Sequence, residues 1–157
     1  MLEQLTGPQA LKFISQIEAP FKGLPHLPKG VVNFLVNIAP WFAALGGVFS
    51  IIAALSSFGA ATGYQSSVWM QLAGINTAYF WLTGVVELIV GVLMLMAFNP
   101  LKEKLLKGWI YMFWIEVIDV AQMLIGVAFG GSNVVSMVIG LLIGLYFLFE
   151  LKSSYKA

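Results

Sequence analysis

The chain has 157 residues, of which 60% are apolar and only 10% are charged. Soluble domains carry about 25% charged residues, so this composition excludes an ordinary water-exposed surface and indicates that most of the outside faces lipid. There is no cysteine and only one histidine, which excludes disulfides, thiol catalysis and metal sites built from several cysteines or histidines of one chain.

The first 30 residues are the only part with an ordinary polar composition, and they form the first predicted unit. Pro8 stands where a helix can begin. Apolar residues then recur at helical spacing: Ala10, Phe13, Ile14, Ile17 and Phe21. An amphipathic helix is expected, either lying at the membrane surface or packed against the cytoplasmic end of the bundle. A Pro/Gly linker at 23–30 separates it from the rest.

The second predicted unit, residues 31–157, contains four long apolar stretches. They cover about residues 31–58, 75–98, 108–129 and 133–151. Each reaches the ~20 residues that cross a ~30 Å hydrocarbon core at ~1.5 Å per residue. Pro40 is expected to tilt or kink the first stretch, because proline removes a backbone donor. The fold class is therefore all-α: an integral membrane four-helix bundle with an N-terminal amphipathic interfacial helix.

The connections and the lysines predict the orientation. Residues 59–74 form an uncharged connection, and residues 130–132 form a tight turn that makes the last two spans an antiparallel hairpin. With four spans, all eight lysines fall on one side of the membrane and none on the other. Positive charge near span ends marks the cytoplasmic face. We therefore expect both termini to be cytoplasmic, in a multi-pass protein of the cell inner (cytoplasmic) membrane.

Small or polar residues recur along one face of each of the four spans, and they predict where the helices meet. Membrane helices associate through small residues because lipid provides no hydrophobic drive for their association. The predicted packing positions are Ala43, Gly47, Gly84, Gly91, Gly140 and Gly144. The last two form a GxxxG pattern, which faces either the inside of the chain or a second copy.

Three acids fall inside the spans, and they are the candidate functional residues. At helical rise, Glu87, Glu116 and Asp119 lie about 16, 14 and 18 Å deep, close to mid-bilayer. Gln122 continues the same stripe. Acidic residues at this depth are energetically unfavourable in lipid, and where they occur they are usually functional. No lysine or arginine lies within the spans to pair with them. They are expected either to hydrogen-bond between helices as protonated groups or to bind a proton or cation.

Three segments carry a resemblance to other proteins. They are residues 27–41 (LPKGVVNFLVNIAPW), 107–114 (KGWIYMFW) and 139–156 (IGLLIGLYFLFELKSSYK). Together they resemble a class of small four-span integral membrane proteins from candidate-phylum bacteria. The resemblance extends over most of the chain and implies the four-span fold, but it implies no activity.

Two main functions remain open from the sequence. No P-loop, GxGxxG, HExxH or GxSxG pattern is present, which favours a non-enzymatic scaffold or accessory subunit of a membrane assembly, without a cofactor. The three acids favour the alternative, a proton- or cation-coupled small carrier or channel; a membrane enzyme with an acid-only metal site ranks below both. The expected partners are the lipid bilayer and a second copy or another subunit of a membrane complex. Nucleic acid is not expected, because the basic residues are few.

Overall fold

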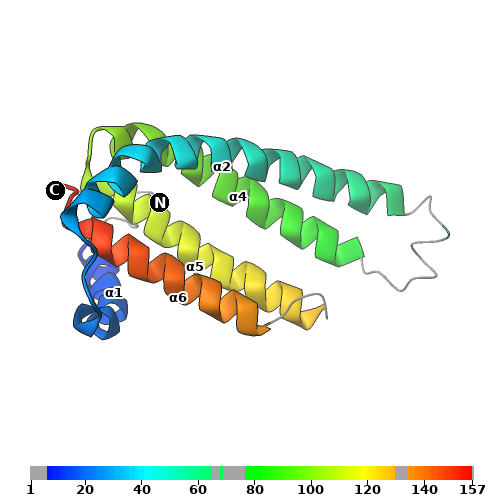
Figure 1. Ribbon diagram of the computed structural model, residues 1–157. Coiled ribbons are helices and arrows are strands. Elements are labelled where there is room, and N and C mark those ends of the chain that lie inside the picture. Colours follow the sequence, from blue (N-terminus) through cyan, green and yellow to red (C-terminus); the bar gives the residue numbers. More distant parts are fainter. Residues whose placement is uncertain (1–6, 65–67, 69–76, 130–133, 157) are drawn as a thin grey trace.

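The computed structural model describes residues 7–64, 68, 77–129 and 134–156. Its elements are α1 (Pro8–Glu18), the 3-10 helix η2 (Ala19–Gly23), α2 (Lys29–Tyr64), α4 (Thr77–Lys102), α5 (Leu106–Ala128) and α6 (Val134–Lys152). The four long helices run up and down side by side, and α1 and the end of α6 lie at the same end (Figure 1). Over the described residues the predicted all-α four-helix bundle is confirmed.

Helix α2 is longer than the apolar stretch that predicts it. It has 36 residues and continues to Tyr64, six positions beyond the expected end. No proline interrupts this extension, and the Thr62 hydroxyl donates back to the carbonyls of Phe58 and Gly59, 3.0 Å away in each case. The helix changes direction over its first third, the part that contains Pro40 (Figure 1). Apart from residue 68, the rest of the uncharged connection lies outside the described residues, as does the turn at 130–132.

Helices α2 and α4 pack most closely, and glycine makes this approach possible. A Cβ built on Gly47 lies 3.0 Å from the carbonyl oxygen of Gly91, and one built on Gly91 lies 3.0 Å from that of Gly47. Ala43 is completely buried one turn away. At Gly84 of α4, the ring of Phe58 occupies the place of a side chain, 2.5 Å from a built Cβ. The positions predicted for packing on these two helices thus lie at their interface.

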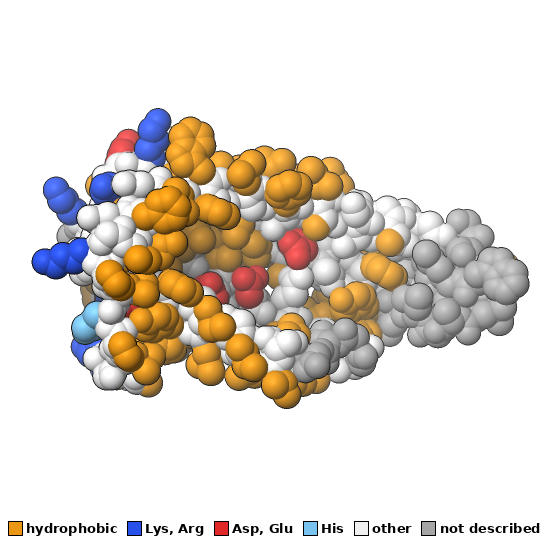
Figure 2. Space-filling view, in the orientation of Figure 1, with side chains coloured by type: hydrophobic (Ala, Val, Ile, Leu, Met, Phe, Trp, Pro, Cys, Tyr) orange, Lys and Arg blue, Asp and Glu red, His pale blue; other side chains and the backbone are white. Residues whose placement is uncertain are grey.

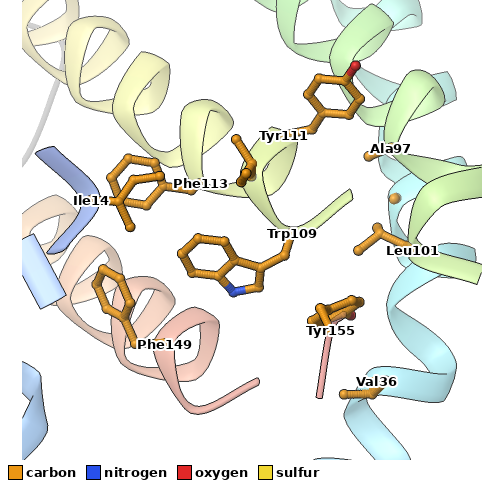
Figure 3. Packing of buried hydrophobic residues seen from close by; sticks show 11 residues of the cluster. Ile14, Val36, Ala97, Leu101, Trp109, Tyr111, Phe113, Phe149 and Tyr155 are labelled. Atoms are coloured by element: carbon orange, nitrogen blue, oxygen red, sulfur yellow. The ribbon is translucent and has the colours of Figure 1, made fainter. Parts of the chain in front are cut away.

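The lysine-bearing end of the bundle holds the main hydrophobic core. Trp109 and Phe113 of α5 pack with Phe149 of α6, and the rings of Trp109 and Phe149 lie 5.8 Å apart (Figure 3). Ile14 of α1 is completely buried in the same cluster, and the ring of Phe13 stacks on Trp114 at 6.1 Å. Helix α1 therefore packs against the end of the bundle, which is one of the two placements expected for it.

Polar contacts tie the N-terminal linker to the end of α6. The two carboxylate oxygens of Glu150 accept hydrogen bonds from His26 Nδ1 and from the Leu27 backbone N–H, both at 2.8 Å. The Tyr146 hydroxyl donates to the carbonyl of Pro25 at 2.5 Å, and Lys152 pairs with Glu18. These contacts hold α1 and its linker on the bundle.

The C-terminal tail closes this end from the other side. The backbone of Lys156 accepts from Leu106 N–H at 2.6 Å and donates to Lys104 at 2.8 Å, which binds the tail to the α4–α5 turn. Tyr155 of the same tail is buried, and burial raises the pKa of its hydroxyl to about 12, so it stays neutral. One end of the molecule is therefore closely packed.

The other half of the bundle is open. Helix α6 packs mainly against α5 and touches α2 at few positions. Phe149 is the one buried residue among the 19 of α6, and it belongs to the closed end. Helices α4 and α5 stay in contact up to the opposite end, where the rings of Tyr79 and Phe129 lie 5.7 Å apart, whereas α2 and α6 lie apart there (Figure 1). The four helices thus form an arc that is closed at the lysine end and unclosed beyond it.

Candidate functional site

The open half contains a hollow with acidic side chains. Figure 2 shows these side chains in the middle of one face, bordered by hydrophobic side chains, while the lysines visible in that view gather at one end. A cavity of about 280 Å³ lies here between α5 and α6. It is lined by Glu116, Asp119, Val120 and Met123 of α5 and by Met137, Gly140 and Leu141 of α6.

Glu87 joins α4 to α5 through a polar contact. The Gln122 amide nitrogen donates to Glu87 Oε1 at 2.8 Å. The amide oxygen of Gln122 is buried and has no hydrogen-bond partner among the described residues. Two of the candidate residues, predicted on different spans, therefore make a direct contact between two helices, through side chains that are only partly buried.

Glu116 lies between α5 and α6, against Gly144. A Cβ built on Gly144 lies 2.7 Å from one carboxylate oxygen of Glu116 and 2.9 Å from the other. The missing side chain at Gly144 therefore creates the space that the carboxylate occupies. Gly140, the other glycine of the GxxxG pattern, has no atom within 4 Å of a built Cβ and lines the cavity. One glycine faces the inside of the chain and the other faces open space.

Asp119 completes the site. It lies one turn from Glu116 on the same face of α5, lines the same cavity and has an exposed side chain. Glu87 is close enough to interact with it electrostatically. The structure thus places Glu116 and Asp119 together at the cavity and Glu87 beside them, paired with Gln122. Within the described part of the chain, no three histidine, aspartate or glutamate side chains are arranged to hold a metal ion.

The two glycines of the GxxxG pattern make a matched test of this geometry. Gly144→Ala is expected to lower the free energy of unfolding by about 1–3 kcal/mol, because the new methyl group must displace Glu116 or separate the helices. Gly140→Ala is expected to be neutral or slightly stabilising, since the added methyl group meets open space. Thermal unfolding in detergent, followed by circular dichroism, compares the two variants.

A compensating substitution identifies the cause of the loss at Gly144. Truncation of the acid in the double variant Gly144→Ala/Glu116→Ala removes the atoms that the methyl group meets, so most of the lost stability is expected to return. Equal destabilisation by Gly144→Ala and Gly140→Ala, or no recovery in the double variant, would show that the carboxylate does not occupy this space.

The fold and its surface define the class of protein. Four described helices are long and apolar enough to cross a membrane: Lys29–Gly63, Thr77–Lys102, Leu106–Ala128 and Val134–Lys152. Large apolar side chains are exposed along them, including Phe42 and Phe49 at 67% and 66%. Such a surface is suited to lipid, and the chain is a multi-pass membrane protein. It matches no known protein family, no curated protein and no solved structure, so the site itself must carry the functional argument.

Proposed function

We propose that this protein is a non-enzymatic accessory or scaffold subunit of an assembly in the cytoplasmic membrane. The observation that carries the proposal is the unclosed arc of helices, in which α6 buries one residue and leaves its outer face uncovered. Membrane helices that pack so little against their own chain are available to pack against another. The closely packed lysine end would then serve as the rigid base that holds the open half in place.

The position of the lysines supports the orientation within this proposal. All eight lie at the end of the bundle where the described chain begins and ends: on α1 and η2, at the start of α2, around the α4–α5 turn, and from the end of α6 onward. Because positively charged residues near span ends are retained in the cytoplasm, both termini and α1 are assigned to the cytoplasmic side. Helix α1 then lies at the level of the lipid headgroups, where an amphipathic helix is stable.

One observation favours a second candidate, a proton- or cation-coupled carrier. Glu116 and Asp119 face a cavity near mid-bilayer, and Asp119 is exposed in it. An ionised carboxylate in lipid costs at least ~2.5 kcal/mol, so a site of this kind is suited to exchange of a proton or cation. The accessory proposal and the carrier proposal make opposite predictions for the purified protein in vesicles.

Reconstitution distinguishes the two functions. We expect the purified protein, in liposomes loaded with a pH-sensitive dye, to give no proton or Na⁺ flux above that of protein-free liposomes. The reason is that an accessory subunit by itself transports no ions. The matched variants are the triple amide Glu87→Gln/Glu116→Gln/Asp119→Asn and Glu103→Gln, whose acid lies in the α4–α5 turn. A flux that the triple variant loses and Glu103→Gln keeps would overturn the accessory proposal in favour of the carrier.

A further inference from the structure

The hollow between α5 and α6 has the features of a protein–protein interface whose partner is absent. Its lining on α5 extends from Glu116 to Met123, about 10 Å at helical rise. The walls are apolar, apart from the two carboxylates, and two of the lining residues are methionines, whose flexible side chains adapt to a partner surface. Gly140 leaves its part of the wall without a side chain, so that another backbone can approach closely.

The two carboxyl groups in the hollow have no basic partner at their depth in the chain. No lysine or arginine occurs between residues 30 and 101 or between 108 and 151. A second copy of the chain therefore brings no cation to this depth, because its lysines also lie at the end of the bundle. Lipid headgroups lie at the interface, about half a bilayer thickness away from mid-membrane. A basic side chain that pairs with Glu116 or Asp119 must therefore belong to an apolar transmembrane segment of another protein.

From this complementarity we infer that the hollow receives a transmembrane helix of a partner protein that carries one lysine or arginine near mid-span. The inference rests on the proposed accessory function and specifies the partner. Ionisable groups inside membranes pair with one another, and a buried pair is stable only when both charges are present. The helix packs its apolar side chains against Val120, Met123 and Leu141 and places its basic group beside Asp119. The uncovered face of α6 provides further packing surface.

A synthetic helix tests the inference directly. The purified protein, labelled with a donor dye at its C-terminus, is reconstituted in nanodiscs with an acceptor-labelled 23-residue Leu/Ala peptide. The peptide carries either Lys or Met at its centre. Energy transfer is expected to show binding of the Lys peptide at least about tenfold tighter than that of the Met peptide, because only the former neutralises the acids.

Two variants locate the binding site. Glu116→Gln/Asp119→Asn is expected to remove the preference for the Lys peptide, while Gly140→Leu fills the open space and is expected to weaken binding of both peptides. Glu103→Gln and Gly59→Leu are the matched controls, because Glu103 is in the α4–α5 turn and a Cβ built on Gly59 meets no atom within 4 Å. Unfolding temperatures of all variants establish that each is folded.

Several results would overturn the inference. Equal binding of the Lys and Met peptides would show docking by shape alone, which leaves the accessory function intact and removes the charged partner. Absence of binding by both peptides would reject a helix as the occupant. Energy transfer between two labelled copies that Gly140→Leu abolishes would identify a second copy instead. None of these outcomes coincides with cation flux in liposomes, the result that overturns the accessory function itself.

Discussion

Replacement of Trp109 by alanine is expected to lower the free energy of unfolding by about 3–5 kcal/mol, the range for truncation of a large buried aromatic side chain. Trp109 is 1% exposed. Its indole N–H donates to the carbonyl of Leu148 at 2.6 Å, and its ring lies 5.9 Å from that of Phe113 and 5.8 Å from that of Phe149. The substitution removes the centre of the core that joins α5 to α6.

Denaturant titration in mild detergent, followed by far-UV circular dichroism, measures this loss. Trp41→Ala is the matched control, because Trp41 is 60% exposed on α2 and its removal leaves little cavity. Trp109→Phe is expected to fall between the two, since it keeps an aromatic ring and loses the hydrogen bond to Leu148. A loss at Trp109 no larger than the loss at Trp41 would contradict the assignment of the core to this end of the bundle.

The second large effect is expected at the contact of α2 with α4. A Cβ built on Gly91 lies 3.0 Å from the Gly47 carbonyl oxygen and 3.1 Å from the Ile51 amide nitrogen. Both atoms belong to the backbone, which cannot move aside as a flexible side chain does. Gly91→Ala is therefore expected to cost about 1–3 kcal/mol of unfolding free energy, and Gly91→Leu is expected to cost more.

Gly59→Ala provides the control for this prediction on the neighbouring helix. Gly59 lies in α2, and nothing comes within 4 Å of its built Cβ. Alanine there removes the flexibility of glycine from the helix interior and is expected to stabilise by about 0.5–1 kcal/mol. The same detergent titration compares the two variants. Substitutions of equal effect at Gly91 and Gly59 would show that α2 and α4 are not in backbone contact.

The contrast between the two halves of the bundle connects these predictions to function. The lysine end is closed by α1, by the contacts of Glu150 and by the C-terminal tail. The distal half has a cavity, two carboxylates beside it and an uncovered helix. A rigid end next to an unclosed half is the arrangement expected when a membrane subunit presents a preformed surface to a partner, because little ordering is needed on binding.

The sequence alone determined the number and positions of the spans and the confinement of the lysines to one end. Both follow from composition, because about 20 consecutive apolar residues have one stable placement in lipid. It also indicated which glycines pack, since Gly47 lies on the small-residue face of the first span and Gly84 and Gly91 lie on that of the second, and the structure places all three at the interface of α2 with α4.

Only the tertiary structure decided how the chemically important side chains are paired. Gly140 and Gly144 are equivalent in the sequence pattern, yet one faces open space and the other faces Glu116. His26 and Glu150 are 124 positions apart, and no local pattern connects them. These outcomes depend on how far each helix is rotated about its axis and on which neighbours it meets. Small differences in packing energy between helices determine both, and periodicity within one helix does not encode them.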